Sequence, residues 1–264
     1  MTSVIVGLSI FLSGFAAAAT QGESVFLDEL TSPELARRIA SGSTTALVPI
    51  GGTEQNGPHM VLGKHNVRVH VLAGRIAAGL GNAVVAPVVA YVPEGSVKPP
   101  QGHMRYAGTI SISDASFEAM LEGIARSLKQ HGFREIVFLG DHGGYQRDLE
   151  HVASRLTQEW RLDPACRVHA LRTYYDAAQA PFAAVLREHG HGAGEIGVHA
   201  GLADTSLALA VDPRLVRMEH LLATLPDRDG VVGDPRQATA ELGQIGAQAI
   251  VQASIAAIRK LQQR

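Results

Sequence analysis

Apolar runs of strand length alternate with amphipathic segments of helix length along most of the chain. The runs are TTALVPI (44–50), AVVAPVVAYV (83–92), EIVFLG (135–140) and CRVHALRTYY (166–175). Valine, isoleucine and aromatic residues, which favour strands, are frequent in them. Strands that alternate with helices predict a mainly parallel sheet with helices on both faces. We therefore expect an α/β fold, a single-domain layered α/β/α sandwich.

Helical patterns fill the segments between and around these strands. They lie at about 31–42, 67–80, 115–131, 145–160, 177–188 and 238–261. The first has Thr31 or Ser32 as N-cap, Pro33 in its first turn and Gly42 as its stop.

Length and charge restrict the classes of partner. The chain has 264 residues, 46% of them hydrophobic, and a formal net charge of -2 at pH 7. A chain of this length can bury one substantial core, so we expect residues 20–264 to form one domain. Nucleic acids and anionic membranes are bound by clustered cations, which a nearly balanced chain does not supply. A small-molecule substrate is the expected partner, with no nucleic acid.

The first residues, MTSVIVGLSIFLSGFAAAAT, predict a signal peptide. An uncharged apolar segment is followed by Ala16 to Ala19, which is typical of a signal-peptide core and its small-residue cleavage site. We expect a signal peptide at 1–19, a mature chain that begins near Thr20 or Gln21, and a periplasmic or secreted protein. A hydrophobic N-terminal anchor or helix is the alternative. No later segment is long enough to predict a membrane span in the mature chain.

Cys166 is the single cysteine of the chain. A single cysteine excludes an intramolecular disulfide and the cysteine-rich zinc sites. Any metal ion must therefore be bound by histidines and carboxylates.

Two of the predicted strands run directly into loops that carry such residues. Glu54 follows the strand at 44–50, and His142 follows the strand at 135–140. Ligand sites collect at the carboxyl ends of parallel strands, so these two side chains should meet. His65 lies eleven residues past Glu54, on a glycine- and proline-containing loop that can fold back. One glutamate and two histidines form the ligand set of several catalytic zinc sites and of the non-haem iron facial triad.

A third cluster, VHAGLADTS (198–206), contains His199 and Asp204. A histidine and an aspartate around a small-residue loop can supply a proton-transfer group. Asp204 would be a further metal ligand, a general base or the group that orients His199.

The motifs GGTEQNGPHMVLGKH (51–65), GDHGGYQ (140–146) and HAGLADTS (199–206) resemble, in this order, those of the creatininase family of metal-dependent amidohydrolases. The segments EGSVKPPQGHMRYAGTISI (94–112) and GVVGDPRQATAELG (230–243) resemble further family blocks. The resemblance implies a creatininase-like fold, hydrolysis of an amide, a small-molecule substrate and a hexamer with sites near subunit boundaries. His59 and His103 lie in these motifs and are expected to contact the substrate or the metal ligands.

The resemblance also implies a two-metal site, and this chain differs at three of its positions. Asn56 stands where the family has a histidine of the second metal, His65 where it has a bridging aspartate, and Asp204 where it has a glutamate. Two divalent ions need carboxylates to balance their charge. A neutral imidazole at position 65 in place of an aspartate removes one negative charge. We therefore expect about one ion per subunit, held by Glu54, His65 and His142. Zinc is expected, with manganese or iron as alternatives.

The remaining roles follow from position. Asn56 should form hydrogen bonds near the metal. Asp141 is expected to contact the substrate or the metal ligands, and it could also cap the helix that follows it. The function expected is hydrolysis of a C–N bond in a cyclic or linear amide by a metal-activated water, with His199 or Asp204 handling protons. A lactone hydrolase, an Fe(II) enzyme and a non-catalytic protein that binds a small ligand are the alternatives.

Overall fold

The computed structural model describes residues 24–163 and 165–263, and its centre is a four-stranded parallel sheet. The strands are β1 (Thr45–Ile50), β2 (Ala83–Val85), β3 (Glu135–Gly140) and β4 (Arg167–Ala170), in the order β2-β1-β3-β4. Every residue of β1 is buried, as in a central strand that is covered on both faces. The parallel sheet predicted from the apolar runs is confirmed.

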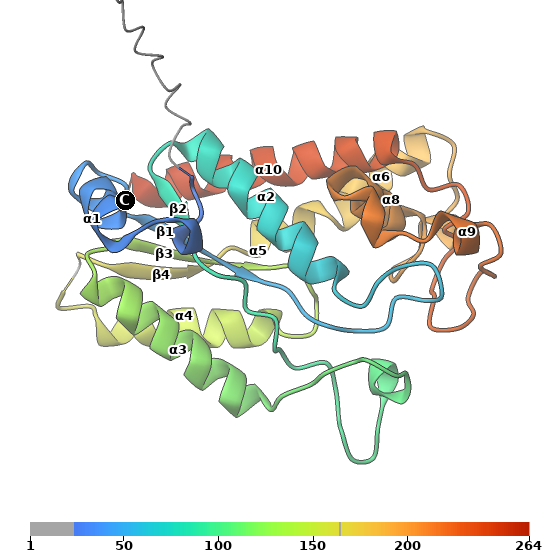
Figure 1. Cartoon of the computed structure of the whole chain (residues 1–264), viewed down its shortest axis with the longest axis horizontal. Helices are drawn as coiled ribbons and strands as arrows, with labels where there is room; N and C mark the ends of the chain where they lie inside the picture. Colours follow the sequence, from blue (N-terminus) through green and yellow to red (C-terminus); the bar gives the residue numbers. More distant parts are fainter. Residues whose placement is uncertain (1–23, 164, 264) are drawn as a thin grey trace, which may run out of the picture.

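Side chains of the central strands point alternately into two apolar layers. Leu47 and Val137 belong to one cluster, whereas Val48 and Phe138 belong to the other. Two pairs of helices cover the two faces: α2 (Lys64–Leu80) with α10 (Ala240–Gln262), and α3 (Asp114–Gln130) with α4 (Gln146–Glu159). Figure 1 shows these pairs on opposite sides of the sheet. The predicted α/β/α layering is thus confirmed.

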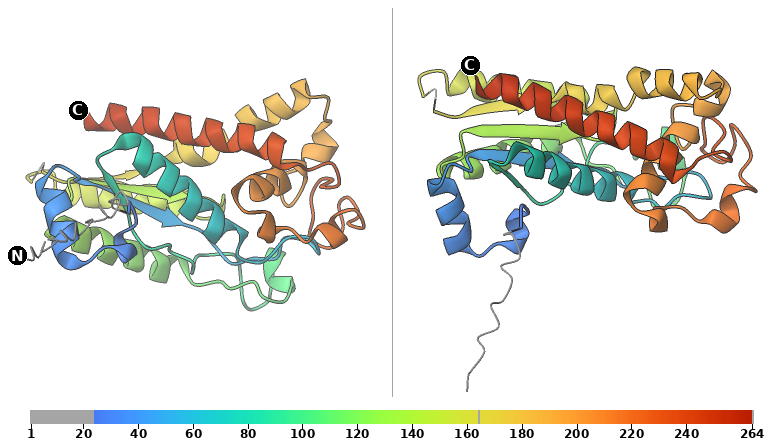
Figure 2. Two further views of the ribbon diagram at one scale, coloured as in Figure 1. Left: turned by 45° about the horizontal axis from the view of Figure 1, so that its top comes forward. Right: turned by 90° about the horizontal axis from the view of Figure 1, so that it is seen from above.

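Shorter helices complete the described chain. They are α1 (Ser32–Ala40), α5 (Arg172–Ala177), α6 (Ala180–Glu188), α7 (Ala193–Ile196), α8 (Leu202–Val211) and α9 (Met218–Leu221), with 3-10 turns η1 (Leu27–Glu29), η2 (Gly102–Arg105) and η3 (Pro213–Leu215). Helices α6, α8 and α9 lie at the end of the molecule opposite α1 (Figure 1). The long α10 packs against α8 and α5 and extends along one face, which the two views of Figure 2 make clear.

Local signals explain where several helices begin and end. Thr31 and Glu34 form the capping box of α1, and Ser113 accepts a hydrogen bond from the Ser116 amide at the start of α3. Gly81, at the end of α2, has a left-handed backbone conformation, which glycine adopts without a steric penalty.

Two predicted strands are too long. The segment 83–92 continues as a strand only to Val85, and Pro87 has no amide hydrogen to extend the ladder. The segment 166–175 leaves the sheet after Ala170 and turns into α5. The cluster 198–206, expected as a loop, enters α8 at Leu202. These corrections change the lengths of elements and leave the order of the sheet unaffected.

No helix in residues 24–163 and 165–263 is long and apolar enough to cross a membrane. The signal peptide predicted at 1–19 lies outside the described residues.

Strand pairing and side-chain hydrogen bonds hold the ends of β1 and β3 together. Ile50 of β1 pairs with Gly140 of β3, and both strands stop there. The buried hydroxyl of Tyr145 lies 2.8 Å from the main-chain oxygen of Ile50, and it also accepts hydrogen bonds from the amides of Asp141 and His142, each at 3.1 Å. The two loops that leave these strands therefore start from a fixed relative position.

Candidate metal centre

The carboxylate of Glu54 lies at the centre of a buried polar cluster beyond the ends of β1 and β3. Glu54 is fully buried. Its Oε1 accepts a hydrogen bond from Nε2 of His65 at 2.8 Å, whereas its Oε2 has no hydrogen-bond partner among residues 24–163 and 165–263. A buried carboxylate oxygen without a partner is costly, and a cation beside it removes that cost.

Glu94 and His142 form a first candidate metal group with Glu54. Nε2 of His142 lies 3.8 Å from Oε2 of Glu54, and Nδ1 of the same ring lies 3.6 Å from Oε2 of Glu94. Both oxygens of Glu94 are buried and lack a partner within the described chain. Gly52 leaves room for them, because a Cβ there would lie 2.5 Å from Oε1 of Glu94. Three protein ligands leave open coordination positions, as in catalytic metal sites.

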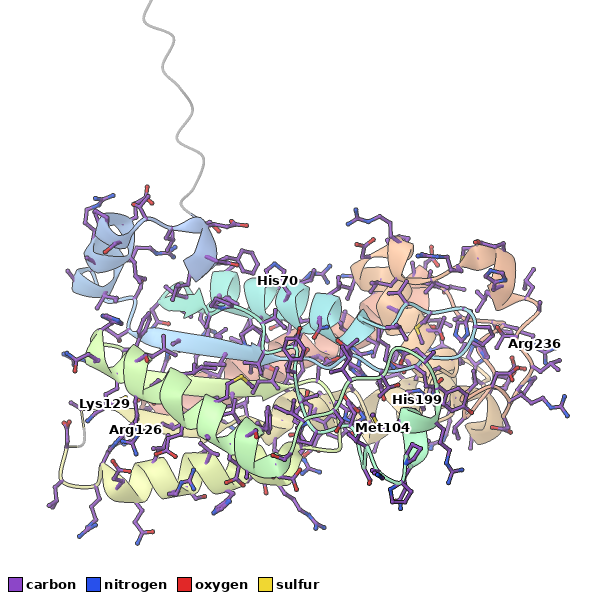
Figure 3. The ribbon with its side chains drawn as sticks, turned by 60° about the horizontal axis from the view of Figure 1, so that its bottom comes forward. His70, Met104, Arg126, Lys129, His199 and Arg236 are labelled. Carbon is purple, nitrogen blue, oxygen red and sulfur yellow. The ribbon has the colours of Figure 1, made fainter. Side chains whose placement is uncertain are left out.

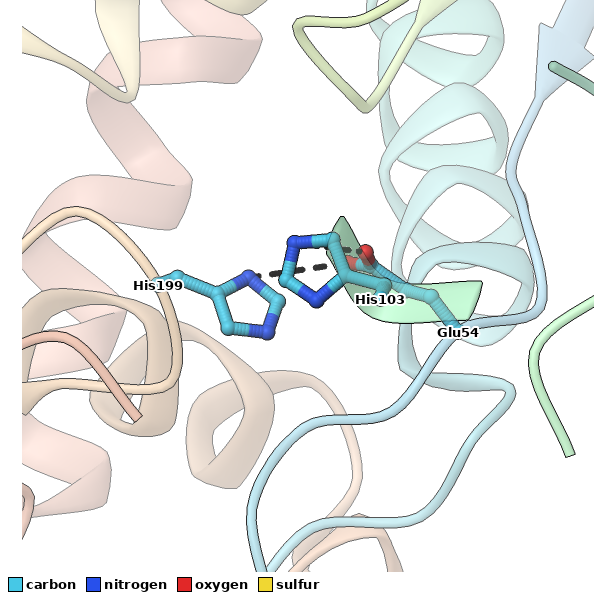
Figure 4. A group of neighbouring side chains, drawn as sticks. All are labelled: Glu54, His103 and His199. Carbon is cyan, nitrogen blue, oxygen red and sulfur yellow. Dashed lines mark ion pairs between the residues drawn. The ribbon is translucent and has the colours of Figure 1, made fainter. Parts of the chain in front are cut away.

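His103 and His199 form a second group on the same carboxylate (Figure 4). Nε2 of His103 lies 3.6 Å from Oε2 of Glu54, and Nδ1 of His199 lies 3.7 Å from Oε1. Gln55 holds both rings: its side-chain nitrogen lies 2.6 Å from Nδ1 of His103, and its main-chain oxygen accepts from Nε2 of His199 at 2.9 Å. Figure 3 labels His199 and Met104, the neighbour of His103, at the same end of the molecule. Both groups share Glu54 and so belong to one centre.

Burial and neighbouring charges determine the protonation of these groups. Burial raises the pKa of Glu54, but the hydrogen bond and charge of His65 outweigh it and hold that pKa below its ordinary value. Burial beside the ionised Glu54 raises the pKa of Glu94 to about 8. Burial is the main cause that lowers the pKa of His142 to about 4 and that of His199 to about 3. Both rings are therefore neutral at pH 7, which is the form that binds a metal.

His65, a predicted metal ligand, bridges two carboxylates. Besides its bond to Glu54, its Nδ1 lies 2.6 Å from Oδ2 of Asp141. Burial and the charge of Lys64 lower the pKa of His65, but the hydrogen bonds to Asp141 and Glu54 outweigh them and raise it. Both ring nitrogens take part in these bonds, and His65 belongs to neither candidate group.

Asp204, predicted to handle protons or bind metal, lies among cations. It accepts hydrogen bonds from Nζ of Lys64, from Nη1 of Arg68 at 2.6 Å and from the amide of Ala200 at 2.9 Å. Burial raises the pKa of Asp204, but the two cations hold it well below its ordinary value. So acidic a carboxyl group is a poor general base at neutral pH.

Asn56 and His59 support the loop that carries Glu54. The Asn56 side-chain nitrogen donates to the main-chain oxygens of Glu54 at 2.9 Å and of Val61 at 3.1 Å. Nε2 of His59 lies 2.9 Å from the hydroxyl oxygen of Thr205, which comes from α8. The structure places these two predicted site residues around the centre and outside both candidate metal groups.

Asp141 lies next to the centre, where three side chains donate hydrogen bonds to it. It accepts hydrogen bonds from His65, from Nε of Arg68 at 2.9 Å and from the hydroxyl of Tyr174 at 2.8 Å. Asp141 does not cap the next helix, because α4 has Tyr145 as its N-cap and no side-chain cap bond. It contacts His65, the neighbour of Glu54, in keeping with its predicted place around the metal ligands. The carboxylate is already engaged by these three donors.

A pocket of about 700 Å³ opens beside the centre. His103, His142 and His199 line it, together with the cations Lys64 and Arg68. Small residues form much of the remaining wall, among them Ala178, Ala180, Ala183, Ala193, Gly194, Gly197 and Ala203. The pocket therefore has histidines and cations at one end and a wall in which these small residues lie between larger ones such as Tyr175, Ile196 and Leu207.

Sequence reasoning missed Glu94, Lys64 and Arg68. Glu94 is the one acidic residue in the irregular segment 93–108, and that isolation was the available signal. Lys64 and Arg68 are four residues apart at the start of α2, a spacing that puts them on one helix face.

Comparisons with known proteins identify the family. The chain matches the Creatininase family, described as creatinine amidohydrolase, over residues 28–258. Creatinine amidohydrolase of Pseudomonas putida is 27% identical over 265 residues, which cover 90% of this chain and 97% of that protein. The mycofactocin precursor peptide peptidase of Mycolicibacterium smegmatis is 30% identical over 231 residues, which cover 79% of this chain and 81% of that protein.

Solved structures show the same fold. A mutant creatininase described as Zn-Zn type and a creatininase described as containing Mn each superpose with a TM-score of 0.74 at 28% identity. In both cases the match covers 90% of this chain and 98% of the other. The fold predicted from the motifs is thereby confirmed.

Proposed function

The chain belongs to the creatininase family of metal-dependent amidohydrolases, and from this premise we propose that it hydrolyses an amide C–N bond with one divalent ion held by Glu54, Glu94 and His142. The observation that carries the proposal is the set of buried carboxylate oxygens without a partner in the described chain, Oε2 of Glu54 and both oxygens of Glu94. Zinc is the ion proposed, with manganese and iron as alternatives, and the descriptions of two structural relatives name zinc and manganese.

This ligand set differs from the predicted set in one residue. Glu94 takes the place of His65, whose two ring nitrogens already bond to Glu54 and Asp141. The second candidate group adds two histidines and no carboxylate beyond the shared Glu54, so a second ion there would have little negative charge to balance it. We therefore keep the expected stoichiometry of one ion per chain.

The chain's own residues provide the remaining chemistry. A divalent ion at this position supplies Lewis-acid polarisation of the scissile carbonyl and acidifies water in its coordination shell. His199 donates through Nε2 to Gln55, so Nδ1 carries no proton and faces the centre from the pocket wall. A neutral ring held in this way can accept a hydrogen bond from the attacking water through Nδ1 and orient it, although its lowered pKa makes it a weak base. Gln55 fixes its tautomer and orientation.

The size of the pocket favours a linear amide of peptide length. A volume of about 700 Å³ lies within the range of sites that enclose drug-sized ligands, and a single small cyclic amide would leave most of it empty. A relative at 30% identity is a precursor peptide peptidase. The small side chains of the wall leave space for an extended chain to reach the metal group.

We also propose export to the periplasm or beyond, and a homo-oligomer with the hexamer as the form implied by the resemblance. Export is proposed on the apolar segment before Thr20. N-terminal sequencing of periplasmic material should begin near Thr20 or Gln21, and intact Met1 in the cytoplasm would refute export. Light scattering would refute the oligomer by showing a monomer at working concentration.

The experiment for the reaction uses chain purified without added metal and then loaded with zinc or manganese. Short peptides, a cyclic amide and a lactone are offered as substrates. We expect metal-dependent cleavage of the peptide amide, lost together with the metal in Glu54→Gln and His142→Ala and kept in His220→Ala, an exposed histidine. Lactone cleavage alone, oxygen chemistry with iron, or ligand binding without turnover in every form would contradict the proposal.

A further inference from the structure

The residues at the positions that the resemblance assigns to a second metal ion are not arranged to hold one. The Asn56 side-chain nitrogen donates hydrogen bonds to the main chain. Its side-chain oxygen has no partner in the described chain, but as an uncharged amide oxygen it could offer a metal ion only one weak ligand. His65 uses both ring nitrogens to bridge Glu54 and Asp141. Asp204 is bound to Lys64 and Arg68.

Two buried cations occupy the surroundings of these carboxylates. Lys64 is 1% exposed; its Nζ forms an ion pair with Asp204 and lies 3.9 Å from Oε1 of Glu54. Arg68 is 5% exposed and reaches Asp204 at 2.6 Å and Asp141 at 2.8 Å. One ammonium and one guanidinium carry the same formal charge as one divalent ion. They arise from consecutive turns of α2 and meet the same carboxylates from one side.

We propose that Lys64 and Arg68 act as a built-in dication that takes the place of the second metal ion. The inference rests on the proposed function, because it explains why a centre of this family would use one ion. Buried carboxylates need nearby positive charge, and these two side chains supply it without dissociating. A second metal ion beside Asp204 would have to displace Lys64 and would be repelled by Arg68.

Lys64 and Arg68 also lie within the proposed active site. Lys64 and Arg68 line the same pocket as His142 and His199. A chelator would therefore remove one ion and leave the two positive charges of Lys64 and Arg68 in place. The metal-free protein should keep its fold around Asp141 and Asp204, because neither carboxylate depends on the exchangeable ion.

The test counts ions in wild type and in Lys64→Met, which removes the charge and keeps an unbranched side chain. Lys64→Arg keeps the charge, and Lys260→Met changes an exposed lysine of α10. Metal-free proteins are titrated with zinc by calorimetry, bound zinc is measured after gel filtration, and melting temperatures are recorded with and without zinc.

We expect one ion in wild type, Lys64→Arg and Lys260→Met. Lys64→Met should bind a second ion at least 10-fold more weakly than the first, with a larger zinc-dependent rise in melting temperature than wild type. Two tight ions in wild type, or a folded Lys64→Met that binds one ion, would overturn the inference. If Lys64→Met does not fold, a second ion in folded Lys64→Arg overturns the inference and one ion supports it. A wild type that binds no ion contradicts the proposed function, and zinc uptake by Lys64→Met then decides the inference separately.

Discussion

Nε2 of His65 donates to Oε1 of Glu54 at 2.8 Å and thereby ties the central carboxylate to the first turn of α2. Through Nδ1 the same ring reaches Asp141 at 2.6 Å, so one imidazole connects the loop after β1 with the loop after β3. Hydrogen bonds of this kind orient a ligating carboxylate and are strengthened by its charge. The oxygen that faces the other ligands is thus Oε2 of Glu54.

Replacing His65 by alanine should destabilise the metal-free protein. Two buried carboxylates, Glu54 and Asp141, would each lose a charged donor, and breaking a buried pair costs roughly 3–5 kcal/mol. Urea unfolding in the presence of a chelator measures the loss. The matched control is His131→Ala, since His131 is exposed. Equal unfolding free energies for the two variants would show that the bridge contributes little.

Replacing Glu94 by glutamine should weaken zinc binding at least 100-fold, because a neutral amide is a poor ligand for the ion. His103→Ala should retain most of the affinity, since His103 belongs to the second group. Glu188→Gln serves as a control on an exposed glutamate. Calorimetry measures all three. Loss of zinc in His103→Ala with retention in Glu94→Gln would move the ion to His103 and His199.

Zinc affinity should rise with pH until about 8. The pKa of Glu94 is raised to about 8, chiefly by burial, and its proton must leave before the carboxylate binds the ion. Below that pH, binding should release about one proton from Glu94 and strengthen about tenfold per pH unit. Titration in two buffers with different ionisation enthalpies counts the proton. An affinity that is flat between pH 6 and 8 would exclude Glu94 as a ligand.

The stability of the metal-free protein relative to Glu94→Gln should fall as pH rises. Folded Glu94 keeps its proton up to about pH 8, whereas the unfolded glutamate loses it near 4.3. The folded state binds more protons in this window, so wild type loses stability with rising pH by up to a few kcal/mol, and the variant lacks this loss. His65, whose pKa is also raised, contributes stability that is complete below about 6.5 and disappears as pH passes its folded pKa. Urea unfolding at pH 5 and pH 8 measures the difference, and a constant difference would refute the raised pKa.

Replacing Ala183 by phenylalanine should separate long from short substrates. Ala183 lines the pocket on α6, so the larger ring would fill part of the space assigned to a peptide. We expect KM for a peptide to rise about tenfold, with little change for a two-carbon amide and with zinc retained. Equal effects on both substrates would argue against a peptide in this part of the pocket.

The positions of Glu54 and His142 could be predicted because they follow from the sheet. Apolar runs mark the two central strands, and the carboxyl ends of parallel neighbours meet at one edge. The resemblance to the family then distinguished these loops from ordinary turns. The meeting of His199 with Glu54 depended on motifs alone, since 145 residues separate them and no periodic pattern links them.

The part played by Glu94 could not be predicted in this way. It lies beyond β2, in an irregular segment whose path depends on tertiary packing, and Gly52 makes room for it from another loop. Lys64 was visible in the sequence, but its inward direction depends on how α2 packs on the sheet. A lysine at the start of a helix is usually solvated, so propensity argued against the buried position that it takes.

The pairing of Ile50 with Gly140 has a consequence for maturation. Glu54 and His142 lie a few residues beyond these partners, and a slip of one residue would move one loop by about 3.3 Å and turn its strand's side chains to the opposite face. A chain with mispaired strands would therefore lack an ion-binding centre altogether. Metal uptake at the proposed centre would then follow strand pairing, and mispaired molecules should fail to retain an ion even when metal is in excess.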